Sequence, residues 1–198
     1  MTEPIFTVAL LVGGRGRRLG GVDKSTLIVD GRTILARQLQ EARAVTPQVI
    51  AVASAAGSGT TSDIPTVIDH FPGAGPLGAL ITAILDSPTD VTVVVAGDMP
   101  YVTGPFLAWL AGQCGESNLV LPRDAGGYHP LCAAYHRTAA PALQQALDSG
   151  ERRVQTAVRA LRTLVVGPED YAAFDPEGRL LLNVNTPEDY HSALDRHP

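Results

Sequence analysis

The fold is decided by residues 6–24, which read FTVALLVGGRGRRLGGVDK. The apolar, β-branched run at residues 6–12 predicts a buried strand. Five glycines follow it between Gly13 and Gly21, and glycine lets a backbone bend so that several N–H groups point to one place. With Arg18 and Lys24 beside them, these N–H groups suit a polyphosphate. The alternative is a glycine-rich surface loop that carries solvated charges.

Two familiar nucleotide loops are excluded by the same residues. No Gly-Lys-Ser/Thr ends the loop, and Leu19 stands where a GxGxxG pattern needs its third glycine. Lys24 is the only lysine beside 14 arginines, which indicates a need for a compact ammonium group at that position. Five cations lie within residues 15–32, whereas none lies between Arg43 and Arg123. This uneven charge predicts a local anion site.

Apolar runs and helical periods alternate along the rest of the chain. We expect further strands near residues 49–53, 66–68, 91–96, 119–121, 131–135 and 164–166. We expect helices at 33–45, 77–85, 105–114, 141–148 and 187–196, the last with Thr186 as its N-cap. The alternation predicts an α/β fold with a doubly wound, mostly parallel, Rossmann-like sheet and helices on both faces. Ligands of such sheets bind beyond the carboxyl ends of the strands.

Length and composition favour one domain with its own core. The chain has 198 residues, of which 45% are hydrophobic. We expect an N-terminal nucleotide-binding half over about 1–100 and an acceptor-binding half over about 101–198. A net charge of −5 argues against a nucleic-acid surface. Two distant cysteines, no apolar run of membrane-spanning length and no signal peptide predict a cytoplasmic protein without membrane attachment.

Two aspartates follow predicted strands. Asp98 follows the strand at 91–96 at its carboxyl end, so its carboxylate is expected at the ligand-binding edge as a hard oxygen ligand for Mg²⁺. Asp69 follows the strand at 66–68 and enters a glycine-rich loop that includes Gly78. Its carboxylate could accept hydrogen bonds from a guanine or ribose. Each aspartate could instead serve a turn or helix cap.

Four polar residues of the second half are further candidates. Asn183 and Asn185 alternate on an extended segment, which places both amides on one face. They could orient phosphates or metal-bound water, or simply end a strand. His129 and Arg153 are candidates for the acceptor site; taken alone, such residues more often belong to turns and surface ion pairs.

Several motifs, in order, resemble the molybdenum cofactor guanylyltransferase family. Its first strand runs into a pattern like LAGGxxxRMGGxDKxL, to which residues 11–27 correspond. Val12 and Leu19 depart from that pattern conservatively, at positions where the family often has Ala and Met. The other matching segments are 67–70, 75–80, 97–101, 129–131, 150–154 and 183–188.

The resemblance implies a nucleotide-diphospho-sugar-transferase-like fold and a reaction. The reaction is transfer of GMP from GTP to the terminal phosphate of molybdopterin carrying molybdenum, with Mg²⁺ as cofactor and pyrophosphate as product. Molybdenum-insertion proteins and apo-molybdoenzymes would be the protein partners. The resemblance places Arg18, Lys24 and Asp98 in catalysis, with Asp98 on the metal. The nucleotide-binding residues would be Leu11, Val12, Gly13, Gly14, Lys24, Asp69, Gly78 and Asp98.

Three alternatives share parts of this pattern. A cytidylyltransferase acting on the same pterin would differ chiefly in the loop after the first strand. A sugar-1-phosphate nucleotidyltransferase would use the same phosphate chemistry. A noncatalytic carrier would keep the fold and deliver the cofactor to apo-enzymes, but it has no need of Arg18, Lys24 and Asp98 together. Because guanine is larger than cytosine, the missing Cβ atoms at Gly13 and Gly14 favour GTP.

Overall fold

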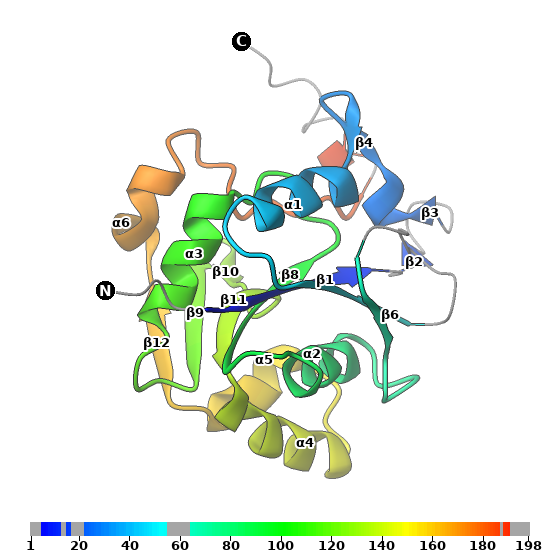
Figure 1. The fold of residues 1–198 in the computed structure, drawn as a ribbon, viewed down its shortest axis with the longest axis vertical. Helices are drawn as coiled ribbons and strands as arrows, with labels where there is room; N and C mark the ends of the chain where they lie inside the picture. Colours follow the sequence, from blue (N-terminus) through cyan, green and yellow to red (C-terminus); the bar gives the residue numbers. More distant parts are fainter. Residues whose placement is uncertain (1–4, 13–14, 17–21, 55–63, 187, 191–198) are drawn as a thin grey trace.

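One central sheet with helices on both faces organises the chain (Figure 1). The computed structural model describes residues 5–12, 15–16, 22–54, 64–186 and 188–190. The strands of the sheet are β1 (Thr7–Val12), β6 (Val49–Ala53), β7 (Thr66–Ile68), β8 (Val91–Ala96), β9 (Leu119–Asp124), β10 (Gly127–Tyr128), β11 (Cys132–His136) and β12 (Thr163–Val166). Two small antiparallel pairs lie outside it, β2 (Arg15–Gly16) with β3 (Val22–Asp23) and β4 (Ile28–Val29) with β5 (Arg32–Thr33).

The sheet is mostly parallel, as predicted. Its order is β10-β9-β11-β8-β1-β6-β7. The eighth strand, β12, pairs with β9 and is not part of this order. The strands β7, β6, β1 and β8 form a parallel block, and β12 is parallel to β9. β11 runs antiparallel to both of its neighbours, β8 and β9. The β8 and β1 strands are held in a register that pairs Ala96 with Leu11, so both end at the same edge of the sheet.

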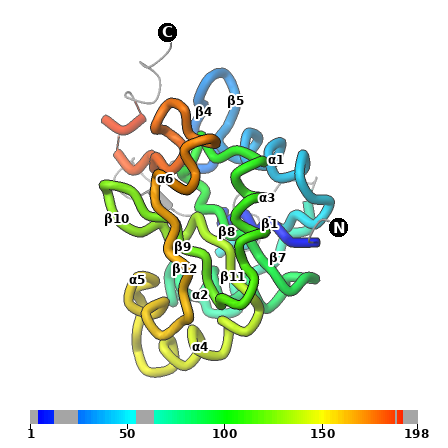
Figure 2. Tube along the Cα trace, turned by 90° about the vertical axis from the view of Figure 1, so that its left-hand side faces the viewer, coloured from blue at the N-terminus to red at the C-terminus, as the bar shows by residue number. Residues whose placement is uncertain are grey.

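The helices form two layers, one on each face. The helices are α1 (Ile34–Arg43), α2 (Pro76–Leu85), α3 (Gly104–Gln113), α4 (Ala140–Asp148), α5 (Val154–Ala157) and α6 (Pro168–Tyr171). Figure 1 shows α1 and α3 on one face of the sheet and α2, α4 and α5 on the other. In the view of Figure 2, the β10 hairpin and the orange-to-red C-terminal segment lie on the same side of the molecule. Within the described residues, no helix is long and apolar enough to cross a membrane.

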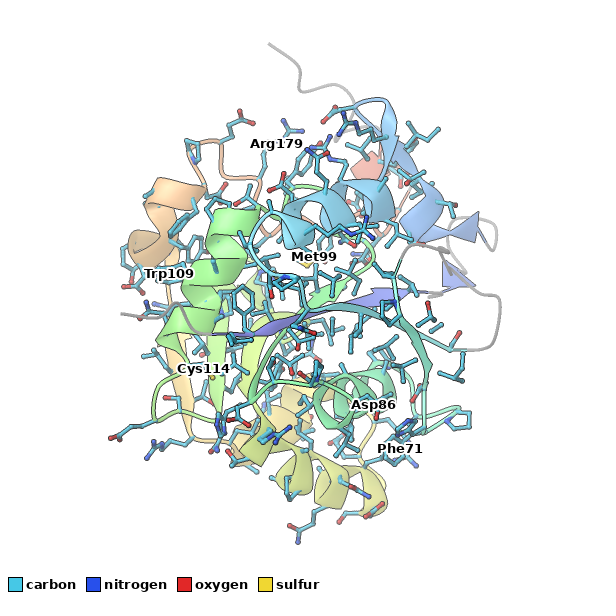
Figure 3. All side chains as sticks on the ribbon, viewed as in Figure 1. Phe71, Asp86, Met99, Trp109, Cys114 and Arg179 are labelled. Carbon is cyan, nitrogen blue, oxygen red and sulfur yellow. The ribbon has the colours of Figure 1, made fainter. Side chains whose placement is uncertain are left out.

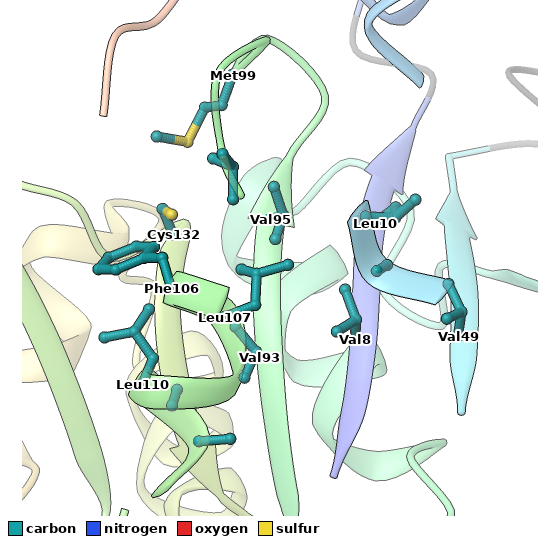
Figure 4. Close-up of a cluster of buried hydrophobic side chains, with 14 of the residues drawn as sticks. Val8, Leu10, Val49, Val93, Val95, Met99, Phe106, Leu107, Leu110 and Cys132 are labelled. Atoms are coloured by element: carbon teal, nitrogen blue, oxygen red, sulfur yellow. The ribbon is translucent and has the colours of Figure 1, made fainter. Parts of the chain in front are cut away.

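Each face of the sheet has its own hydrophobic core. On the α1 and α3 face, Phe106 and Leu107 pack with Val93 and Val95, and Met99 joins them above the end of β8 (Figure 4). On the other face, α2 and α4 bury a second cluster that includes Leu80, Ile84 and Leu143. Burial of a large apolar side chain stabilises the fold by about 1.5–3 kcal/mol, so two cores hold the central strands firmly.

Most predicted elements are found, with small changes at their ends. The strands at 49–53, 66–68 and 91–96 have the expected bounds, whereas β9 continues to Asp124 and pairs there with β10. Helix α1 begins after Thr33, whose hydroxyl accepts from the Ala36 N–H at 3.1 Å. For the expected helix at 187–196, the described residues 188–190 are helical; the remainder, like most of the loop expected at 54–62, lies outside the described residues.

Candidate active site

The turn after β8 places Asp98 at the carboxyl end of the sheet. Gly97 lies so close to β1 that a Cβ atom there would be 2.7 Å from the Leu11 carbonyl oxygen. Met99, on the other side of Asp98, is 1% exposed and is buried in the core (Figure 4). The turn is therefore fixed on both sides of Asp98, which is itself half-buried.

A cavity of about 310 Å³ opens beside this turn. It brings together Asp98, His129, Arg153, Asn183 and Asn185, five residues that the sequence nominated from both halves of the chain. The other lining residues are Pro76, Ala96, Met99, Tyr128, Pro130, Leu131, Cys132, Arg152, Val154 and Gln155. Burial raises the pKa of the Cys132 thiol to about 12, so this thiol is protonated at neutral pH and is not a nucleophile.

The C-terminal segment joins the site through the backbone of Asp98. The Val184 N–H donates to the Asp98 carbonyl at 2.8 Å, and the residues on either side, Asn183 and Asn185, both line the cavity. The segment is anchored beyond them by a capping box, because Asp189 and Thr186 each accept a backbone N–H of the other. The predicted N-cap at Thr186 is confirmed.

Arg179 anchors the same segment on its other side. Its side chain is labelled in Figure 3. The guanidinium carbon lies 3.8 Å from the centroid of the Tyr101 ring, a cation–π contact. Burial raises the pKa of the Tyr101 hydroxyl, and the charge of Arg179 opposes that rise. Because Tyr101 follows Asp98 closely in sequence, this contact and the Val184 hydrogen bond tie the two segments together.

His129 is held by the β9–β10 hairpin. Its Nε2 lies 3.0 Å from Asp124 Oδ1. The same oxygen accepts from the Gly126 and Gly127 N–H groups at 2.7 and 3.1 Å, which fixes the Asp124 side chain within the hairpin. The side chain of His129 is 12% exposed, so it forms a wall of the cavity rather than part of the outer surface.

The turn before α5 presents Arg153. Glu151 Oε1 accepts from the Arg152 and Arg153 N–H groups, both at 2.8 Å, and these bonds hold the pKa of Glu151 below its usual value. The Arg152 guanidinium donates to the Leu147 and Glu151 carbonyls, so it closes the end of α4. The described residues provide no hydrogen bond or ion pair to the Arg153 guanidinium, which is exposed at the cavity.

The loop after β1 is described only in part. Leu11 and Val12 end β1 beside the Asp98 turn. The 3-10 helix η2 (Lys24–Thr26) lies next to it as well, because a Cβ at Gly97 would be 3.6 Å from Ser25 Cβ. Gly13, Gly14, Arg18 and the side chain of Lys24 lie outside the described residues, and their roles stay predictions.

Asp69 and Gly78 are not among the residues that line the cavity. Asp69 is buried, and its Oδ1 accepts from the Phe71 N–H at 2.9 Å and the Thr82 hydroxyl at 3.2 Å. A Cβ at Gly78 would lie 2.9 Å from Phe71 and Ala74 atoms. Both residues thus hold the turn that begins α2, and their contact with a nucleotide stays a prediction.

Ten of the cavity residues were missing from the predicted site, and Tyr128 and Arg152 are two of them. Tyr128 is 56% exposed at the mouth of the cavity, and Arg152 lies beside Arg153. A signal for Tyr128 is present in the sequence, because it directly precedes His129 after two glycines. A β-hairpin turn exposes such neighbours together.

The sheet and its helix layers have the fold of an α/β nucleotidyltransferase, with the cavity at the strand ends. The structure of 2-C-methyl-D-erythritol 4-phosphate cytidylyltransferase from Thermus thermophilus aligns with a TM-score of 0.66 over 93% of this chain and 95% of the other, at 16% identity, and so shares the fold. Residues 8–164 match the family model described as the MobA-like NTP transferase domain. The chain belongs to that family.

Relatives of similar length carry a more specific name. A protein of Chloroflexus aggregans named "Probable molybdenum cofactor guanylyltransferase" is 34% identical over 91% of this chain and 89% of its own. A protein of Methanosarcina mazei with the same name is 31% identical over 93% and 88%. The crystal structure of molybdopterin-guanine dinucleotide biosynthesis protein A from Archaeoglobus fulgidus aligns with a TM-score of 0.80 at 26% identity, over 94% of this chain and 96% of the other.

Proposed function

We propose that the chain transfers GMP from GTP to the terminal phosphate of molybdopterin carrying molybdenum. One observation carries the proposal: the Asp98 carboxylate shares a single cavity with Asn183, Asn185, His129 and Arg153. Full-length relatives named for this activity support the choice of substrates. The three alternatives, a pterin cytidylyltransferase, a sugar-1-phosphate nucleotidyltransferase and a noncatalytic carrier, are separated from it by the experiment below.

The reaction depends on the positioning of the two substrates and on stabilisation of their charge more than on a general base. An oxygen of the acceptor phosphate forms a bond to the α-phosphorus of GTP, while the bond from that phosphorus to the bridging oxygen breaks and pyrophosphate leaves. The second pKa of a phosphate monoester is about 6, so the attacking oxygen is already largely anionic at neutral pH. The protein must hold two polyanions in line and stabilise the charge that moves to the leaving oxygens.

The donor set at the cavity fits Mg²⁺. Asp98, Asn183 and Asn185 line the same cavity, and their side chains carry a carboxylate and two amide oxygens. Hard oxygen donors of this kind suit Mg²⁺, which commonly takes one or two carboxylates together with substrate phosphates and water. Asp98 would hold the ion. Bound there, it would neutralise charge on the GTP phosphates.

The other residues divide between the two substrates. Arg153, exposed on its turn, would bind the acceptor phosphate, and His129 would donate a hydrogen bond to the same group. Leu11, Val12, Gly13 and Gly14 would contact the guanine side of GTP. Arg18 and Lys24 would hold the GTP phosphates, since η2, which begins at Lys24, lies next to the Asp98 turn. A molybdenum-insertion protein would supply the acceptor, and apo-molybdoenzymes would receive the product.

A competition assay tests the proposal. Purified protein is incubated with equal GTP, CTP and ATP, limiting molybdopterin and Mg²⁺, and the dinucleotides are identified by mass. We expect the guanine dinucleotide and stoichiometric pyrophosphate, and neither without molybdopterin. A dominant cytosine product would make the chain a cytidylyltransferase. In a parallel incubation, a sugar 1-phosphate replaces molybdopterin, and transfer to it instead of to molybdopterin would select the second alternative. Binding without pyrophosphate release would select the carrier.

A further inference from the structure

Gln38 is a buried amide on the core-facing side of α1. Its side chain is 2% exposed among Ile34, Leu35 and Leu39 on the same face of the helix. Uncharged amides are seldom buried so fully unless they are hydrogen-bonded. The buried Gln38 amide therefore needs hydrogen-bond partners, and it finds them in the backbone of the turn after β8.

The amide bridges the two ends of that turn. Gln38 Nε2 donates to the Ala96 carbonyl at 2.7 Å and to the Met99 carbonyl at 3.0 Å. These two carbonyls stand on either side of Gly97 and Asp98 in the chain. The next carbonyl along, that of Pro100, accepts from Arg37 Nε at 3.0 Å. Consecutive residues of α1 thus fix the backbone on both sides of Asp98.

We propose that Gln38 is a positioning residue for the Asp98 carboxylate, and through it for the metal ion of the proposed reaction. The inference rests on the proposed function, because it assumes the metal role of Asp98. A carboxylate that shares a metal with a substrate must be held within about 0.5 Å of its productive place. The Gln38 amide supplies that restraint without touching substrate or metal. Residues that orient metal ligands typically change metal affinity or activity by about 10–100-fold when they are replaced.

If Gln38 served packing alone, the expected results would differ. If Gln38 only filled the core, its replacement would lower the melting temperature and weaken every ligand alike, independently of Asp98. If it positions Asp98, its replacement weakens binding only where the metal takes part. The distinguishing quantity is the ratio of affinities for a GTP analogue with Mg²⁺ and with EDTA, here named the metal ratio.

The variants are Gln38→Met and Gln38→Glu, each also combined with Asp98→Asn. Methionine keeps the length of the side chain but has no donor, and glutamate can donate to a carbonyl only while it is protonated. Gln40→Leu is the control, because Gln40 is exposed on the same helix and its side chain bonds Arg32 instead of the turn. The ligand is guanosine 5′-(α,β-methylene)triphosphate, which cannot be cleaved between the α- and β-phosphorus, and affinity is measured by calorimetry.

We expect Gln38→Met to reduce the metal ratio by about 10-fold while affinity in EDTA stays within twofold of wild type. Gln38→Glu should show the same loss at pH 8 and recover part of it as the pH falls and the carboxyl protonates. In the Asp98→Asn background, neither change should reduce the ratio further. A folded Gln38→Met or Gln38→Glu variant with a wild-type ratio, or losses that add to that of Asp98→Asn, would overturn the inference. A wild-type ratio in Asp98→Asn alone would instead refute the metal role on which it rests.

Discussion

Replacement of Gly97 by alanine tests how closely β1 and β8 must approach at the site. The new Cβ would lie 2.7 Å from the Leu11 carbonyl oxygen, whereas ordinary C···O contacts are about 3.3–3.6 Å. One strand end must therefore move by roughly 0.6 Å or more. Inserting a methyl group into a packed site costs about 1–3 kcal/mol, which for a chain of this size lowers Tm by roughly 2–12 °C.

The displacement falls on the residue before Asp98, so activity should suffer more than stability. We expect kcat to drop by an order of magnitude or more, because misplacement by about 1 Å can cost 100-fold. The assays are thermal melting and pyrophosphate release from GTP and molybdopterin. Gly112→Ala is the matched control: it lies in α3 with nothing within 4 Å of its added Cβ, and it should raise stability by up to about 1 kcal/mol. A Gly97→Ala protein that melts and turns over like wild type would refute the close approach.

The remaining predictions concern charge and thiol chemistry. Asp98→Asn should nearly abolish turnover with a Tm within a few degrees of wild type, because the change removes the only negative charge that the proposed donor set offers to Mg²⁺; activity near wild type would remove Asp98 from the metal role. Lys24→Arg should strongly reduce kcat/KM for GTP, since a planar guanidinium does not replace a compact ammonium; unchanged kinetics would make Lys24 an ordinary loop charge. Arg153→Ala should raise the KM for molybdopterin about 10-fold or more, with the KM for GTP unchanged, because the lost bond is charge-assisted; equal effects on both would contradict its place on the acceptor side. Burial raises the pKa of Cys114 to about 11 and that of Cys132 to about 12, so neither thiol should react with iodoacetamide at pH 8 until the protein unfolds, and labelling of the native protein, read by mass, would contradict their burial.

The strands of the parallel block could be predicted closely from sequence, and the direction of β11 could not. Residues 49–53 are an uninterrupted apolar run and residues 91–96 are apolar except for Thr92; they end at Ser54 and Gly97, and such runs have clear limits. The apolar residues of β11 would be buried whether the strand ran parallel or antiparallel to its neighbours. Its sequence therefore does not predict that it lies antiparallel between β8 and β9. Direction is set by the connections and neighbours that pack around it.

The candidate site, too, could be predicted only in part. The place of Asp98 at the cavity could be predicted because a polar residue just after a buried strand stands at the ligand edge, and the spacing of Asn183 and Asn185 indicated that they would lie together, as they do along the cavity. Asp69 satisfies the same rule, yet its oxygen is bonded within the turn before α2, because a strand end can also serve the next helix. The sequence holds one indication of the role of Gln38, which is an amide within the apolar face of α1. Helical spacing alone does not predict which carbonyl groups that amide contacts.

The reversal at β11 also bears on how proteins of this architecture diverge. It divides the sheet at one seam, with the parallel strands β7, β6, β1 and β8 on one side and the hairpin of β9 and β10 with β12 on the other. On the proposed assignment, the first block carries the nucleotide chemistry and the second carries His129, which faces the acceptor. Insertions, deletions and drift in the hairpin leave the pairing of the parallel block in register, so selection can change the acceptor while the catalytic end is inherited intact. To change the acceptor of this protein by design, the segment to exchange is therefore the β9–β10 hairpin, taken from a relative that uses another acceptor.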